Sequence, residues 1–133
     1  MATPARPLVI LIVDDNADSR RLYATYFAEA GFRVEEAGQG FQGIEKAFKV
    51  APDVILMDLM MPALDGWETI RLLKGRARTR AIPIIALTGD TKEDDLKLAR
   101  NAGCDALLMK PCLPEVVFEQ VQRLLNLPVD RGQ

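Results

Sequence analysis

Two short, unbroken apolar runs in this sequence each end in aspartate. Residues 8–13 (LVILIV) lead directly into Asp14 and Asp15, and residues 54–57 (VILM) lead into Asp58. An apolar run of this length is typical of a strand covered on both faces, as in a parallel sheet between two layers of helices. The functional crevice of such a sheet lies at the carboxyl ends of its strands, so these aspartates are candidates for a binding or reacting site. Taken singly, each could also be no more than a loop cap.

The rest of the chain alternates strand patterns with amphipathic helical patterns. Further strands are predicted at residues 32–37, 83–88 and 106–109. A first helix is predicted to run through about residue 30, and further helices at about residues 41–50, 67–74, 92–102 and 114–125. Asn16 or Asp18 can cap the first helix, and Gly31 can end it. The apolar face of that helix is assigned to residues that recur every three or four positions: Leu22, Tyr23, Tyr26, Phe27 and Ala30.

This alternation predicts an α/β fold with five strands and five helices. Strands that are joined through helices pair in parallel by right-handed crossovers, which gives a single doubly wound sheet. The two continuous apolar runs fit central positions, and we therefore predict the flavodoxin-like strand order 2-1-3-4-5. The switch point of that order lies between the first and third strands, where Asp14, Asp15 and Asp58 would meet.

The length of 133 residues fits one folded domain, which we predict at residues 8–126, after an N-terminal extension at 1–7 and before a flexible tail at 127–133.

The composition limits the classes of partner and the cellular location that can be expected. A formal net charge of −2 gives no reason to expect nucleic acid or a membrane surface as a partner. The chain contains no histidine, so none of its own side chains can supply an imidazole base or ligand. Cys104 and Cys112 match no metal or redox spacing, which favours a cytoplasmic protein with reduced thiols.

The polar residues at four strand ends together predict a phosphoryl-transfer site. Parallel strands would bring the three carboxylates to one edge, where their repulsion favours a divalent cation with oxygen ligands, Mg²⁺. Lys110 and Thr88 would contact phosphoryl oxygens, and Asp58 would be the nucleophile that forms an acyl phosphate. Each residue alone also fits a plainer role as a cap, a turn residue or a solvated chain end. The strand-end residues are Asp14 with Asp15, Asp58, Thr88 and Lys110.

From about residue 8 to residue 125, the chain resembles the response-regulator receiver domains of two-component signalling. The motifs that carry the resemblance are VDDN at 13–16, DLMMPALDG at 58–66, LTG at 87–89 and KP at 110–111. The resemblance implies Mg²⁺ ligation by Asp15, Asp58 and the Met60 main-chain carbonyl, with Asp14 acting through a metal-bound water. It also implies a phosphohistidine donor on a histidine kinase or histidine phosphotransfer protein. A cis peptide bond between Lys110 and Pro111 is a further implication.

The resemblance also implies a switch region, at Thr88, Gly89, Leu107 and Pro111. The small Gly89 leaves room for a phosphoryl group beside the Thr88 hydroxyl. Leu107 departs from the family, which often has at that position an aromatic residue that rotates inward on activation. A switch in this chain would then depend on Thr88 and on loop movement. Output, and possible homodimerisation, would use the face formed by the fourth helix, fifth strand and fifth helix.

Three other classes remain as alternatives. A flavin- or nucleotide-binding module of the same fold needs main-chain donors for phosphate in its first loop, where this chain has Asp14, Asp15 and Asn16. A haloacid-dehalogenase-type phosphatase needs a second acid two residues after the nucleophile, where this chain has Met60. The resemblance therefore favours a signalling domain that catalyses only its own phosphorylation and dephosphorylation over a turnover enzyme. A pseudo-receiver that serves only as a docking module is the remaining alternative. On the receiver interpretation, the chain would be either a single-domain regulator or a receiver cut from a longer hybrid kinase or regulator.

Overall fold

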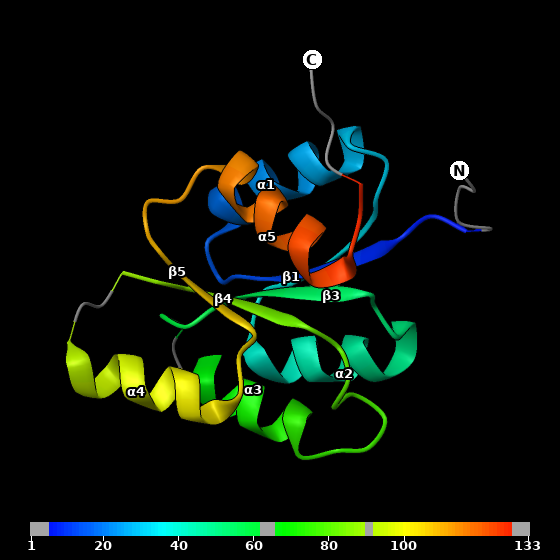
Figure 1. Ribbon diagram of the computed structural model, residues 1–133. Helices are drawn as coiled ribbons and strands as arrows, with labels where there is room; N and C mark the ends of the chain where they lie inside the picture. Colours follow the sequence, from blue (N-terminus) through cyan, green and yellow to red (C-terminus); the bar gives the residue numbers. More distant parts are fainter. Residues whose placement is uncertain (1–5, 62–65, 90–91, 129–133) are drawn as a thin grey trace.

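A five-stranded parallel sheet lies between two layers of helices in the computed structural model, which describes residues 6–61, 66–89 and 92–128 (Figure 1). The strand order is β2-β1-β3-β4-β5, and every neighbouring pair is parallel. The predicted flavodoxin-like fold is therefore confirmed. The strands are β1 (Val9–Val13), β2 (Arg33–Ala37), β3 (Val54–Asp58), β4 (Ile84–Thr88) and β5 (Ala106–Met109).

Helices cover both faces of the sheet. Figure 1 shows α1 and α5 on one face and α2, α3 and α4 on the other. Their bounds are α1 (Ala17–Glu29), α2 (Gly40–Val50), α3 (Gly66–Lys74), α4 (Glu93–Ala102) and α5 (Pro114–Leu125). No helix in the described ranges is both long enough and apolar enough to span a bilayer. The predicted extension and tail fall largely outside the described residues, so the domain boundaries stay predictions.

The three inner strands form the centre of the core. Every residue of β1, β3 and β4 is buried, whereas β2 and β5 at the sheet edges are partly exposed. Successive side chains of a strand point to opposite faces, so each inner strand supplies both hydrophobic layers. Leu11 and Ile55 belong to one buried cluster, and Ile10, Leu56 and Phe27 belong to the other. Burial on both faces explains why these strands read as unbroken apolar runs.

The apolar face assigned to α1 is partly wrong. Tyr23 and Phe27 are buried as predicted, but Leu22 is 55% exposed and Ala30 is also exposed, while Ala24 is buried. Residues on a helix are separated by about 100°, so a stripe centred on Tyr23 and Phe27 includes position 24 and leaves position 22 on its flank. The sequence places apolar residues on both sides of Tyr23, and the packing against the sheet selects one side.

Gly66 allows α3 to start directly against the end of β3. A β-carbon at this position would lie 2.5 Å from the Asp58 carbonyl oxygen and 2.5 Å from the Leu59 Cα atom. Both neighbours are main-chain atoms and cannot move aside by a change of rotamer. A side chain on residue 66 would therefore push α3 away from the strand that carries Asp58.

Replacing this glycine tests the close approach. We expect Gly66→Ala to lower the free energy of unfolding by about 1–3 kcal/mol, because the methyl group overlaps the main chain of β3. Urea unfolding would measure the loss. Gly38→Ala is the control, since a β-carbon there would meet its nearest heavy atom at an ordinary 3.6 Å. Equal unfolding midpoints for the two variants would contradict this account of the α3 start.

Candidate functional site

Parallel pairing brings the polar strand ends to one edge of the sheet. Val13 pairs with Met57, Asp58 with Leu87, and Thr88 with Met109, so the residues that follow these strands lie beside one another. The Lys110 N–H donates to the Thr88 carbonyl oxygen at 2.8 Å, which joins the ends of β4 and β5. Asp14, Asp58, Thr88 and Lys110 thus gather at the carboxyl edge.

Three carboxylates meet at this edge. Asp14, Asp15 and Asp58 each offer an oxygen atom within 4.8 Å of the others. Asp14 and Asp58 are each only 2% exposed, and Asp15 is exposed. Like charges at this separation repel, and burial adds the cost of removing two of them from water. The cluster predicted from the strand ends is therefore present in the fold.

Asp14 has one satisfied and one unsatisfied carboxylate oxygen. Oδ1 accepts a hydrogen bond from the Asn16 N–H at 2.9 Å. Oδ2 is buried, and it accepts no hydrogen bond from the described residues. Burial raises the pKa of the Asp14 carboxyl and the nearby Asp58 charge adds to this, against the opposing hydrogen bond from Asn16. A buried acceptor without a partner is the atom that a bound cation would satisfy.

The Asp58 carboxylate is held on both sides. Oδ1 accepts a hydrogen bond from the Met60 N–H at 2.9 Å, and Oδ2 lies 3.0 Å from the Lys110 Nζ. The Lys110 side chain is 31% exposed, so its ammonium reaches from solvent into the site. The Met60 side chain is itself 54% exposed, which leaves its main chain as the part of the residue that faces Asp58.

The predicted switch residues surround this edge. Thr88 is 2% exposed at the end of β4, and a β-carbon on Gly89 would have no described heavy atom within 4 Å. Leu107 is partly buried and packs against the core cluster on the α2, α3 and α4 side of the sheet. The peptide bond between Lys110 and Pro111 is cis, as the resemblance implied.

Two contacts at the site were not predicted. Arg20, on the first turn of α1, donates from Nη1 to the Asp14 main-chain oxygen at 2.7 Å. The buried Tyr23 hydroxyl donates to the Cys112 carbonyl oxygen at 2.6 Å, in the loop that follows Lys110. Burial, with nearby Cys112 and Asp14, raises the pKa of Tyr23 to about 12, so the phenol keeps its proton at neutral pH. The sequence marked Tyr23 only as a core residue and gave Arg20 no role.

The donor set fits a hard divalent cation. Carboxylate and carbonyl oxygens are the ligands that Mg²⁺ takes in proteins, usually with several waters retained. The exposed Asp15 leaves one side of the cluster open to solvent, and the unpaired Asp14 oxygen lies within it. The protein is thus a doubly wound α/β domain with an acidic cluster at the ends of β1 and β3. The ammonium of Lys110, which follows β5, lies beside that cluster.

The chain belongs to the response regulator receiver domains, since that family model matches residues 10–122. It is 38% identical over 117 residues to the transcriptional regulatory protein ResD of Bacillus subtilis, covering 88% of this chain and 48% of ResD. It is 31% identical over 120 residues to the polar-differentiation response regulator DivK of Brucella anthropi, covering 90% of this chain and 98% of DivK. The chain thus spans about half of ResD and nearly all of DivK.

Solved structures of similar proteins agree with this assignment. The chemotaxis protein CheY4 of Vibrio cholerae superposes with a TM-score of 0.84 at 30% identity, covering 90% of this chain and all of CheY4. The receiver domain of the sensor histidine kinase PA1611 of Pseudomonas aeruginosa superposes with a TM-score of 0.83 at 30% identity, covering 91% and 99%. That receiver has a magnesium ion coordinated in its active-site cleft.

The strain of the carboxylate cluster is measurable in the metal-free protein. We expect Asp14→Asn to raise the free energy of unfolding by about 1 kcal/mol, because it removes a buried charge and leaves an amide that can donate to a neighbouring carboxylate. When a chelator is present to remove metal ions, this corresponds to a rise of roughly 3–5 °C in the midpoint of thermal unfolding of the variant. Asp18→Asn, at an exposed carboxylate in the first turn of α1, is the control and should give no rise. A midpoint for Asp14→Asn at or below that of the control would mean that the cluster is not under repulsion.

Proposed function

We propose that this receiver domain accepts a phosphoryl group on Asp58 in a Mg²⁺-dependent reaction. The donor would be a phosphohistidine on a histidine kinase or a histidine phosphotransfer protein. The Asp58 oxygen would form a bond to phosphorus as the bond from phosphorus to the imidazole nitrogen breaks, and the nitrogen would keep that electron pair. The observation that carries the proposal is the position of Asp58, which is buried in a cluster with two other carboxylates and lies 3.0 Å from the Lys110 ammonium.

Four residues would hold the metal ion. Asp15, Asp58 and the Met60 main-chain carbonyl are proposed as direct ligands, and Asp14 as a ligand through water. The unpaired Oδ2 of Asp14 supports this assignment, because the atom is buried beside the other carboxylates without a described donor. Bound Mg²⁺ would supply positive charge to the phosphoryl oxygens, which is the main contribution a protein site makes to phosphoryl transfer.

Lys110 and Thr88 would contact the transferred group. The Lys110 ammonium pairs with the Asp58 carboxylate in this structure. In the acyl phosphate the negative charge would lie on the phosphoryl oxygens instead of on the carboxylate, and the ammonium would move to contact one of them. The Thr88 hydroxyl would donate to a second oxygen. These contacts would pull the loops that begin at Gly89 and Pro111, and so bias the switch region between two arrangements. Residue 107 is a leucine packed against the core, and not an aromatic residue that could rotate. We therefore expect the loop after Thr88 to move more than β5.

The output surface is proposed to be α4, β5 and α5. Several apolar side chains on or directly beside these elements are exposed, which suits a contact with another protein, a second copy of this chain included. Nucleic acid and membrane surfaces are not proposed as partners, given the net charge of −2. A cytoplasmic location stays a prediction. The exposed apolar residues are Leu98 on α4, Met109 on β5, Val116 on α5 and Leu113, which directly precedes α5.

Phosphorylation by a small donor tests the proposal. With acetyl phosphate and Mg²⁺, the intact mass of the protein should rise by one phosphoryl group. A chelator should abolish the rise because it removes the cation, and Asp58→Asn should abolish it because it removes the nucleophilic carboxylate. Asp53→Asn is the matched control, because Asp53 adjoins the opposite end of the same strand, and it should still be labelled. Undiminished labelling of Asp58→Asn would refute the assignment. Failure of the unsubstituted protein with both acetyl phosphate and a phosphorylated histidine phosphotransfer protein would favour the docking module.

A further inference from the structure

We infer that Arg20 is a positioning residue for the metal site, which sets the directions of the Asp14 and Asp15 carboxylates through the main chain between them. The inference rests on the proposed function, because it requires a metal at the acidic cluster. Neither the family motifs in this chain nor the three carboxylates themselves include Arg20. Its role follows from what its guanidinium contacts.

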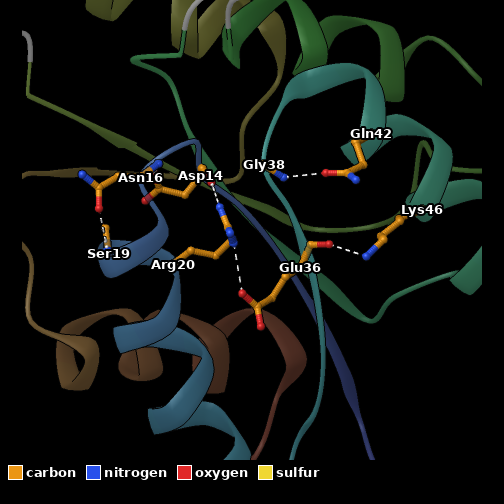
Figure 2. Close-up of polar contacts among 8 residues, drawn as sticks. All are labelled: Asp14, Asn16, Ser19, Arg20, Glu36, Gly38, Gln42 and Lys46. Atoms are coloured by element: carbon orange, nitrogen blue, oxygen red, sulfur yellow. Dashed lines mark hydrogen bonds and ion pairs between the residues drawn. The ribbon is translucent and has the colours of Figure 1, made fainter.

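The guanidinium of Arg20 bridges two strand ends. Nη1 donates to the Asp14 main-chain oxygen at 2.7 Å, and Nε donates to Glu36 Oε1 at 3.0 Å on the neighbouring strand β2. Figure 2 shows Arg20 lying between these two acceptors, with a dashed line to each. The Arg20 side chain is only 22% exposed, so water competes little for either contact. One side chain thus ties α1, the end of β1 and the edge strand together.

The contact to Asp14 fixes a peptide plane. The Asp14 carbonyl and the Asp15 N–H belong to one planar unit, so holding the oxygen also fixes the direction in which Asp15 leaves the strand. The other side of Asp14 is fixed as well, because its N–H donates to the Ala37 carbonyl at 3.0 Å. Within the described ranges, the Asp15 carboxylate forms no hydrogen bond or ion pair of its own. Its direction therefore depends on the main chain that Arg20 holds.

The anchor on β2 is itself held in place. Glu36 lies on an edge strand and its side chain is 45% exposed, which alone would make it a mobile partner. Lys46, from α2, donates from its Nζ to the Glu36 main-chain carbonyl. Gln42 Oε1 accepts from the Gly38 N–H at 2.7 Å. Figure 2 shows both α2 side chains reaching this segment, so Arg20 is tied to a supported strand.

The chemistry of the arrangement requires arginine. Two nitrogen atoms in a fixed planar group serve two acceptors at once, whereas a lysine offers a single nitrogen. Because the Arg20 charge is paired with Glu36, its effect at the metal site should come from geometry more than from added positive charge. A variant that keeps the charge and loses the planar group therefore separates the two explanations.

The test compares Mg²⁺ affinity with stability. We expect Arg20→Gln to raise the Mg²⁺ dissociation constant in calorimetry by about tenfold, a size usual for residues that orient metal ligands. Arg20→Lys should fall between this variant and the unsubstituted protein. Arg21→Gln removes the same charge from an exposed neighbour on the same helix and should leave the constant nearly unchanged. In acetyl phosphate labelling, Arg20→Gln should raise the Mg²⁺ concentration for half-maximal rate by the same factor, with little change of rate at saturating Mg²⁺.

The outcomes separate this inference from the proposed function. If the unsubstituted protein binds Mg²⁺ but Arg20→Gln and Arg21→Gln bind it equally well, the inference is overturned and the proposed function stands. If the unsubstituted protein binds no Mg²⁺, both fail. A lowered thermal midpoint without a change in the dissociation constant would assign Arg20 a purely structural role. Should Arg20→Gln not fold, Glu36→Ala frees one side of the same guanidinium and must still weaken Mg²⁺ binding for the inference to hold.

Discussion

Repulsion among three carboxylates is the constraint on which the functional edge depends. The parallel register forces their oxygen atoms to within 4.8 Å, and two of the groups are almost completely buried. Such a cluster is unfavourable unless positive charge or hydrogen-bond donors offset it. The Lys110 ammonium and the Met60 N–H do so for Asp58, and the Asn16 N–H does so for one oxygen of Asp14. The fully buried strands β1, β3 and β4 supply the stability that lets the fold keep this edge under strain.

The same charges connect the site to its surroundings. Lys110 offsets the carboxylates in the metal-free protein, and we propose that a bound cation would take over that task and release the ammonium for a phosphoryl oxygen. The hydrogen bond from the Lys110 N–H to the Thr88 carbonyl already joins the two strand ends that would respond. Helix α1 contacts the loops on both sides, through Arg20 at Asp14 and through Tyr23 at Cys112. An arrangement of this kind can be biased by small changes in charge at its centre.

Most of the fold, and the position of the acidic cluster, could be predicted from the sequence. Unbroken apolar runs identify strands covered on both faces, and alternation with helices makes those strands parallel, which alone places Asp14, Asp58, Thr88 and Lys110 at one edge. The rotation of α1 about its axis could not be predicted, because apolar residues at 22 and 23 fit the same spacing and only packing chooses between them. The contacts of Arg20 and Tyr23 were missed for a related reason. They join a side chain to a main-chain oxygen of another element, and residue type carries no signal for such an acceptor.

A crystal structure of the protein with Mg²⁺ and beryllofluoride would test the central claim most directly. The account predicts beryllium attached to an Asp58 oxygen, with the metal ion contacted by Asp15, Asp58 and the Met60 carbonyl. Lys110 and Thr88 should contact the fluorine atoms, with the ammonium moved from its present place beside the Asp58 carboxylate. A structure with the metal outside the carboxylate cluster, or with Lys110 still paired to an unmodified Asp58 at saturating Mg²⁺ and beryllofluoride, would contradict it.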